Sequence, residues 1–453
     1  LQSDEDETRK AAAIALGRIG DPNSTQALIE MIGENEDLTI FVIGSLAKLG
    51  VSEAFEPLLK QLGNPNPSIR RATIAALNSI GHPEMPTRIQ KLLETGTSLE
   101  LESAIQIAGY FGYQNCKNLI KKCIENPDIK ISCAAIENLP FFEDESSIDI
   151  LVKLYTEGST RVRASVVKAV RHIDSKDNRA VLATSLNDED PWVRYYAIRS
   201  ISNLYQKEHL FKLMLMAKSD PAIQVRMAAI ETIGLMDGTE AVGILSELTQ
   251  DENTDIVLAS IYALGMLDTK ESLQLLFAFI DDYDAAKKLT AIKAIGRFNK
   301  PEVAEKLYLI ASREDKNKQF ANAAIESLSG ILLKQATNYL LKLSDQNHLT
   351  QKCIAALLKQ KHFALPILNE LFKMKSSPIQ RNIIEFLSRA KTPEATKSLV
   401  LLLEDDTAQI RIDAMRALYR IGYQDITEIT EKISLTDPDV YARYYAKEIL
   451  KKK

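Results

Sequence analysis

The sequence predicts an all-α protein, a right-handed α-solenoid of about fourteen stacked helical hairpins with a period of about 31 residues. Three observations lead to this prediction. An apolar residue recurs at a nearly constant interval along all 453 residues, its neighbours have helical spacing, and a turn-forming residue follows it. No stretch has the alternating pattern of a strand. We therefore expect one continuous solenoid over residues 1–453.

The recurring apolar residue, which we call the anchor, lies at the centre of each repeat. Successive anchors are about 31 residues apart, which indicates a repeat architecture. The anchors are Leu16, Leu46, Leu77, Ala108, Leu139, Val170, Ile201, Ile233, Leu264, Ile295, Leu328, Leu357, Leu387, Leu418 and Leu450.

The segment around each anchor is predicted to be a helix. In one repeat the apolar residues are Val193, Ala197, Ile201 and Leu204, which lie on one helical face. The residue four positions before the anchor is usually small, as at Ala197, and this allows a neighbouring helix to approach closely. These anchor helices should form one layer of the solenoid.

Each anchor helix is expected to end in a left-handed turn that leads into a second helix. Glycine stands four residues after the anchor in several repeats, and glycine tolerates the backbone conformation that ends a helix. These glycines are Gly20, Gly50, Gly81, Gly112 and Gly422. The segment that follows, such as residues 54–63, has an apolar stripe of about three helical turns.

Composition limits the functional classes. The chain is 45% apolar and 26% charged, its net charge is −5, and it has no apolar run long enough to span a membrane. The acidic balance argues against a dedicated nucleic-acid binder. Four cysteines in a chain of this length are too few for a disulfide framework, and we expect reduced thiols in a cytoplasmic protein.

The sequence offers no constellation for catalysis. It contains no phosphate-binding loop, dinucleotide fingerprint or zinc-protease motif. Cys116 and Cys123 share a helix face, but a structural zinc site needs four ligands. We therefore expect no catalytic residue, no cofactor and no metal, and we do not expect an enzyme.

The repeat resembles the HEAT repeat, and in particular the short bacterial type named after phycobilisome lyases. Residues 8–22, TRKAAAIALGRIGDP, carry the pattern of that type almost unchanged, and the resemblance covers essentially the whole chain. It implies a helical solenoid from a bacterial protein. It also leaves open a bilin lyase activity on a phycobiliprotein as an alternative function.

The resemblance implies a ladder of acidic and basic side chains that ties successive repeats together. An acid thirteen residues before the anchor is expected to pair with a base seven residues before it, and an arginine fork there can bridge an acid of its own repeat and one of a neighbouring repeat. The pairs are Glu157 with Arg163, Asp188 with Arg194, Asp220 with Arg226, Asp282 with Lys288, Asp405 with Arg411, and Asp437 with Arg443. We interpret these residues as structural.

The repeat pattern is weakest in residues 300–365, and the chain begins in the middle of a repeat. The base is missing at Thr39, Leu101, Ser132, Val257, Ala321, Thr350 and Gln380. Residues 300–365 are either a drifted part of a tolerant repeat or a hinge or partner site. We expect this chain to be a fragment of a longer protein.

The outward positions of the anchor helices carry two local basic strips with tyrosines. Tyrosine and arginine contribute most to interface energetics, so these strips are the candidate surface for a protein partner or for other domains of a parent chain. The candidates are Lys168, Arg171, Tyr195, Arg199, Lys359, Arg389, Arg416, Arg420 and Tyr444. The lone tryptophan, Trp192, is expected to pack rather than to recognise a ligand.

The predicted function is therefore a non-enzymatic scaffold or adaptor that binds a protein along the concave face of the solenoid. Bilin lyase activity is one alternative. Nucleic-acid binding through the basic strips is the second, although the net charge of −5 disfavours it.

Overall fold

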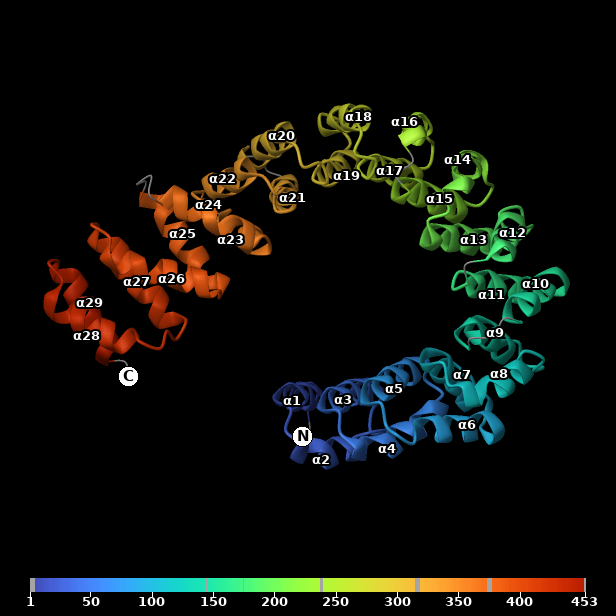
Figure 1. The fold of residues 1–453 in the computed structure, drawn as a ribbon. Helices are drawn as coiled ribbons and strands as arrows, with labels where there is room; N and C mark the ends of the chain where they lie inside the picture. The colour runs from blue at the N-terminus through green and yellow to red at the C-terminus, as the bar shows by residue number, and fades with distance from the viewer. Residues whose placement is uncertain are drawn as a thin grey trace. The chain divides into compact units, whose positions relative to one another are not determined.

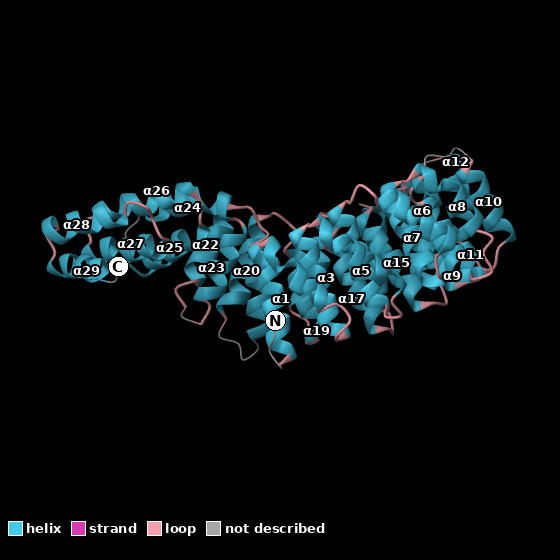
Figure 2. Ribbon diagram, turned by 90° about the horizontal axis from the view of Figure 1, so that it is seen from below, coloured by secondary structure: helices cyan, strands magenta, loops and turns pink. Residues whose placement is uncertain are grey.

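The computed structural model describes residues 5–142, 146–173, 175–236, 239–313, 318–346, 348–372 and 377–451. Its described part consists of helices and connecting loops without a strand (Figure 2). Contacts divide the chain into two compact units, residues 1–209 and residues 210–453. The all-α repeat fold expected from the sequence is confirmed.

Unit 1 is built from two layers of helices. The anchor helices pack against one another in chain order, and in Figure 1 they form the inner, concave layer of this unit. They are α1 (Asp6–Ile19), α3 (Glu36–Leu49), α5 (Pro67–Ile80), α7 (Ser98–Phe111), α9 (Ile129–Asn138), α11 (Thr160–Val170) and α13 (Pro191–Leu204). The second helices are α2 (Thr25–Glu30), α4 (Phe55–Leu59), α6 (Met85–Thr95), α8 (Lys117–Cys123), α10 (Ser147–Glu157) and α12 (Lys176–Ser185).

Unit 2 repeats the same alternation. Its anchor helices are α15 (Ile223–Leu235), α17 (Thr254–Leu264), α19 (Ala285–Ile295), α21 (Lys318–Leu328), α23 (Thr350–Lys359), α25 (Ser377–Ala390), α27 (Ala408–Arg420) and α29 (Val440–Lys451). Its second helices are α14 (Leu210–Ser219), α16 (Val242–Leu248), α18 (Lys270–Ile280), α20 (Pro301–Ser312), α22 (Lys334–Leu343), α24 (Lys361–Phe372), α26 (Pro393–Leu401) and α28 (Ile426–Thr436).

Short 3₁₀ helices complete several repeats, most often at the start of a second helix or just after it. They are η1 (Pro22–Ser24), η2 (Ser52–Ala54), η3 (Lys60–Gly63), η4 (Gln114–Cys116), η5 (Leu139–Phe141), η6 (Lys207–His209), η7 (Thr239–Ala241) and η8 (Leu402–Glu404). Between residues 300 and 365 the described segments keep the helical alternation, and the proposed hinge there stays a prediction.

The anchors lie in the core between the two layers. Every anchor from Leu46 to Leu418 is buried, whereas Leu16 and Leu450, in the first and last anchor helices, are only partly buried. The small residues four positions earlier, such as Ala197 and Ala446, are completely inaccessible to solvent. Each repeat therefore buries its apolar stripe mainly against its neighbours, as in other solenoids.

In several repeats the residue four positions after the anchor adopts the left-handed conformation. Gly20, Gly50 and Gly81 have φ angles of 77°, 64° and 63°, and each of their N–H groups donates to the anchor carbonyl oxygen. Residues with a side chain occupy the same slot at Tyr205 and Lys391, with φ angles of 54° and 52°. A side chain in this conformation is strained, whereas glycine is not.

Close approach of successive anchor helices depends on the residue directly after the anchor. A Cβ atom added to Gly265 would lie 2.7 Å from the Cβ of Ala294, and one added to Gly296 would lie 2.5 Å from the Cβ of Ser327. In unit 1 the same position is Gly17, which meets Ser45. These glycines let neighbouring anchor helices pack in near contact.

Among the described helices, none combines the length and the apolar character that a bilayer crossing requires.

Candidate functional site: the ladder and the anchor face

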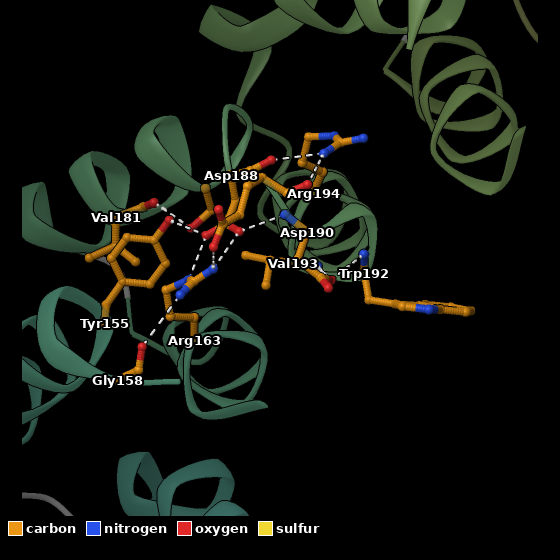
Figure 3. Close-up of polar contacts among 11 residues, drawn as sticks. Tyr155, Gly158, Arg163, Val181, Asp188, Asp190, Trp192, Val193 and Arg194 are labelled. Atoms are coloured by element: carbon orange, nitrogen blue, oxygen red, sulfur yellow. Dashed lines mark hydrogen bonds and ion pairs between the residues drawn. The ribbon is translucent and has the colours of Figure 1, made fainter. Parts of the chain in front are cut away.

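Where a repeat carries the ladder arginine in full, its guanidinium joins that repeat to the next. In unit 1, Arg163 from α11 donates from Nε to Oδ2 of Asp188 at 2.8 Å and from Nη2 to Oδ1 at 2.9 Å (Figure 3). The same guanidinium donates to the carbonyl oxygen of Gly158 in its own repeat at 3.4 Å. Two parallel charge-assisted bonds of this kind fix the relative position of both partners.

The acidic residue is oriented by the turn that precedes the next anchor helix. Oδ1 of Asp188 accepts the backbone N–H of Asp190 at 2.9 Å, and Asp190 in turn caps α13 by accepting from Trp192 and Val193. Arg194 then donates to the carbonyl oxygens of Asp188 and Glu189, at 2.8 and 3.1 Å. The carboxylate thus faces the preceding repeat, while the carbonyl groups face the arginine of its own repeat.

The same arrangement recurs in unit 2. Arg411 donates to both carboxylate oxygens of Asp437 at 2.8 and 2.7 Å, and its Nη1 donates to the carbonyl oxygen of Asp405 at 2.7 Å. Arg443 donates to the carbonyl oxygen of Asp437 at 2.5 Å. Arg226 forms an ion pair with Asp251, a residue that was not among the predicted ladder residues.

This geometry corrects the pairing within one repeat that the pattern suggested. The carboxylate partner of Arg163 and of Arg411 lies in the following repeat, and the contact within the repeat goes to backbone carbonyl groups. The reason is the turn, which uses one carboxylate oxygen to hold the backbone and points the group away from the arginine six residues later.

Further contacts are made by other predicted ladder residues. Asp220 and Asp282 each accept the backbone N–H two residues later, at 2.9 and 2.8 Å. Lys288 lies over the ring of Phe320, with its Nζ 5.2 Å from the ring centroid. Glu157 is the last residue of α10.

Several positions without a base still close the turn with a short polar side chain. Thr39 donates to the carbonyl oxygen of Asn35 at 2.7 Å, Ser132 to that of Ile124 at 2.6 Å, and Thr350 to that of Ser344 at 2.7 Å. These side chains replace the contact within the repeat. They are too short to reach the following repeat, as the side chain of Arg163 does.

The electrostatics of the ladder favour charged groups. Burial alone would raise the pKa of Asp188, but the hydrogen bonds from Arg163 and from the Asp190 N–H outweigh it and lower this pKa. The hydrogen bond from Arg411 is the largest cause that lowers the pKa of Asp437. Both aspartates therefore stay ionised at neutral pH.

The anchor face, defined as the solvent-exposed side of the anchor helices, holds the predicted partner-binding residues. In unit 1, Lys168 and Arg171 lie on or just after α11, and Tyr195 and Arg199 lie on α13. Lys168 forms an ion pair with Glu137 of the preceding repeat at 3.1 Å, and its Nζ lies 4.3 Å from the ring centroid of Tyr196.

In unit 2 the predicted residues lie on α23, α25, α27 and α29. Arg420 contacts Glu385 at 3.1 Å, and Lys359 contacts Glu326 at 3.5 Å. Arg389 donates to Oε1 of Gln351 at 2.8 Å. Contacts between anchor helices therefore hold these cations in place. The sequence did not predict these contacts, because they depend on the offset between neighbouring helices.

Two exposed aromatic side chains on the anchor face, Trp192 and Tyr441, were not among the sequence candidates, whereas the nearby Tyr444 was. Trp192, for which the sequence favoured packing, is 51% exposed, and Figure 3 shows its indole pointing away from the ladder. Tyr441 and Tyr444 on α29 are 75% and 58% exposed. The exposure of these aromatic residues could have been predicted from their positions relative to the anchors, because those positions lie on the same side of the helix as the basic strips.

The described residues offer little for metal or thiol chemistry. None of them form a group of three or more His, Cys, Asp or Glu that could hold a metal ion. All four cysteines are free, and burial raises the pKa of Cys116 to about 11 and of Cys353 to about 12. A thiol in such surroundings stays protonated and unreactive at neutral pH.

Comparison with known families identifies the repeat. Residues 33–103 and 210–286 match the family described as HEAT repeats, and residues 8–34 match the PBS lyase HEAT-like repeat. No curated protein matches the chain.

Similar solved structures include three proteins of low sequence identity to this chain. Yeast importin-β is 11% identical, with a TM-score of 0.44 over 100% of this chain and 86% of its own. The Escherichia coli protein YibA is 18% identical, with a TM-score of 0.41 over 57% and 96%. The CpcE–CpcF phycocyanin lyase complex of Nostoc is 18% identical, with a TM-score of 0.32 over 50% and 92%. The family matches show that this chain contains HEAT repeats and that its first repeat is of the phycobilisome-lyase type.

Proposed function

We propose that this chain is a non-enzymatic scaffold that binds a protein partner along its anchor face. The observation that carries the proposal is the concentration of exposed aromatic and cationic side chains on that face in both units. In unit 1 these include Trp192 and Arg199, and in unit 2 they include Tyr444 and Arg420. Aromatic residues and arginine dominate the binding energy of protein interfaces.

The contacts between repeats prepare this face for binding. Lys168 forms an ion pair with Glu137, and Arg420 forms one with Glu385. Both side chains are therefore partly ordered before a partner binds. Fixing side chains before binding reduces the entropy that an interface must overcome. A face built from many repeats also spreads the binding energy, so single substitutions should weaken binding only modestly.

The cellular setting belongs to the same proposal. We place the scaffold in the cytoplasm of a bacterium, as an interaction module for a separate protein or for other domains of a parent chain. The short repeat type of residues 8–34 and the four free cysteines support this setting, because reduced thiols are the rule in the cytoplasm.

The test is capture of partners from a lysate of the native host, followed by mass spectrometry. The anchor-face variant reverses Lys168, Arg171, Arg199, Arg389, Arg416 and Arg420 to Glu. The matched control makes the same change of charge in the second-helix layer, which carries exposed lysines at Lys60, Lys91, Lys122, Lys153, Lys397 and Lys432. Far-UV circular dichroism verifies that both variants fold.

The proposal predicts that a specific protein binds the wild type and the control but not the anchor-face variant. Equal recovery of every protein by all three would contradict it. Loss with the control alone would place the partner on the second-helix layer and would also contradict it.

A further inference from the structure

The segment around Trp192 recurs in the last anchor helix with the same register. α13 reads Trp-Val-Arg-Tyr-Tyr-Ala from Trp192, and α29 reads Tyr-Ala-Arg-Tyr-Tyr-Ala from Tyr441. In both, the aromatic residues stand nine, six and five positions before the anchor. No other anchor segment has an aromatic residue at more than one of these positions.

The surroundings of the two segments match as well. A cation from the preceding anchor helix covers the third aromatic ring: Lys168 lies 4.3 Å from the ring centroid of Tyr196, and the guanidinium carbon of Arg416 lies 3.9 Å from that of Tyr445. Arg411 and Asp437 repeat the ladder step of Arg163 and Asp188 directly beside them. The resemblance thus extends from sequence to contacts.

Of the first two aromatic residues of each segment, three are exposed and one, Tyr195, is partly exposed. Trp192 is 51% exposed and Tyr195 is partly buried, whereas Tyr441 and Tyr444 are 75% and 58% exposed. The rings of Trp192 and Tyr195 lie 5.6 Å apart with an interplanar angle of 75°. We call Trp192 with Tyr195 platform 1, and Tyr441 with Tyr444 platform 2.

Charge at the outward positions around platform 1 is strongly positive. α9, α11 and α13 present Lys130, Arg161, Lys168, Arg171 and Arg199. The carboxylate at these positions is Glu137, which already accepts from Ser165 at 2.9 Å and from Lys168 at 3.1 Å. This local charge opposes the net charge of −5 of the whole chain, so it favours an acidic ligand here.

Platform 2 has the same sign of charge. α25, α27 and α29 present Arg381, Arg389, Arg416, Arg420 and Lys447. Asp413, Glu385 and Glu448 lie among them, and each already contacts a cation: Asp413 lies 3.5 Å from Arg416, Glu385 lies 3.1 Å from Arg420, and Glu448 lies 2.8 Å from Lys451. An incoming carboxylate would therefore meet a cationic surface at both platforms.

We propose that the two platforms are equivalent docking sites for acidic, extended protein segments that carry aromatic side chains. The ligand's rings would stack on the exposed Trp and Tyr rings, and its carboxylates would meet the surrounding lysines and arginines. Because each unit holds one platform, the chain binds two such segments. This inference rests on the proposed function and specifies the chemistry of the partner.

The test uses the emission of Trp192, the lone tryptophan of the chain, as a reporter for platform 1. The probe is a short acetylated peptide of alternating glutamate and tyrosine. Matched control peptides replace every glutamate by lysine or every tyrosine by glutamine. Calorimetry counts the bound peptides, and the double variant Tyr441→Ala with Tyr444→Ala removes platform 2 at exposed positions.

The glutamate–tyrosine peptide should change the Trp192 emission saturably and should bind in a ratio of two per chain. The platform 2 variant should halve this ratio and keep the change in emission. Tyr195→Ala should weaken binding at platform 1 roughly tenfold, as loss of an interface tyrosine does. Equal or tighter binding of either control peptide, or an unchanged ratio in the platform 2 variant, would overturn the inference.

The outcome separates this inference from the proposed function. If the peptide fails to bind but the six-residue anchor-face variant still loses its partner from the lysate, the scaffold function stands and the acidic-segment platforms are refuted. If the peptide binds but partner capture is insensitive to that variant, the platforms stand and the proposed partner surface is refuted.

Discussion

Arg411 and Asp437 form an almost fully buried step of the ladder, with side chains 9% and 5% exposed. Removing one member of such a pair leaves the other charge buried without its partner. We expect Arg411→Ala to lower the stability of unit 2 by about 3 kcal/mol. The matched control is Arg381→Ala, because Arg381 is 68% exposed and 4.0 Å from Asp413, and it should cost less than about 1 kcal/mol.

Urea unfolding followed by circular dichroism measures both variants. Equal losses for Arg411→Ala and Arg381→Ala would show that the buried ladder step has no special role in stability.

The same step makes stability depend on pH. The hydrogen bond from Arg411 holds the folded-state pKa of Asp437 below its ordinary value. The stability that this shift contributes is complete above the ordinary carboxyl pKa of about 4 and is lost as the pH falls through the folded value. Asp437→Asn should therefore lower stability at neutral pH, and its difference from the wild type should shrink in acid.

Unfolding midpoints at a series of pH values test this expectation. A difference between Asp437→Asn and the wild type that stays constant down to the most acidic pH would contradict it.

Lys391 occupies the turn slot where other repeats have glycine, and its φ angle is 52°. A residue with a side chain is strained there, so we expect Lys391→Gly to stabilise unit 2 by about 1 kcal/mol. Lys391→Ala is the control, because alanine keeps the strain and removes only the long side chain. A gain from alanine as large as that from glycine, measured by thermal unfolding, would show that the backbone conformation is not the cause.

At the scale of the elements, close packing of anchor helices is the feature most open to test. Gly265 on α17's C-terminal side lies against Ala294 of α19, and an added Cβ would come within 2.7 Å. Gly265→Ala should cost about 1–3 kcal/mol through overpacking. Gly243 of α16 has open space around it, so Gly243→Ala should instead stabilise by about 0.5 kcal/mol through helix propensity.

Thermal unfolding of these two alanine variants gives the comparison directly. Opposite signs are expected, and a loss of stability in both would attribute the effect of Gly265 to something other than helix contact.

The helices themselves could be predicted from the sequence because each one repeats a local pattern. The anchors and the small residues before them, such as Ile201 and Ala197, reach their buried positions through helical periodicity alone. Which acid Arg163 bonds, the one in its own repeat or the one in the next, could not be predicted in the same way. Its geometry depends on a turn in which one oxygen of Asp188 holds the backbone and redirects the carboxylate.

The anchor face shows the same limit. Positions on one helix indicate that Lys168 and Arg420 point outward, but their contacts with Glu137 and Glu385 depend on how neighbouring helices are offset. The exposure of Trp192 likewise depends on which neighbours cover the first turn of α13. A pattern within one repeat contains no information on these relations between repeats.

At the scale of the whole molecule, the chain consists of two compact units that should respond to local change independently. Stability in a solenoid is approximately a sum of repeats and their nearest-neighbour interfaces. Gly265→Ala lies in unit 2, whereas Trp192 reports on unit 1. We expect this variant to lower the urea midpoint seen by circular dichroism and to leave the midpoint of Trp192 fluorescence unchanged.

A single shared transition, in which both signals shift by the same amount, would show that the chain unfolds as one cooperative body. That result would contradict the nearest-neighbour account of its stability.

The central claim is that the anchor face binds a protein partner, and the affinity of the purified partner tests it most directly. Calorimetry should compare the wild type, the six-residue anchor-face variant and the six-residue second-helix control. The account predicts a loss of at least about a hundredfold for the anchor-face variant, because several rim and centre contacts are reversed together. It predicts nearly wild-type affinity for the control. Equal affinity of all three proteins would contradict the claim.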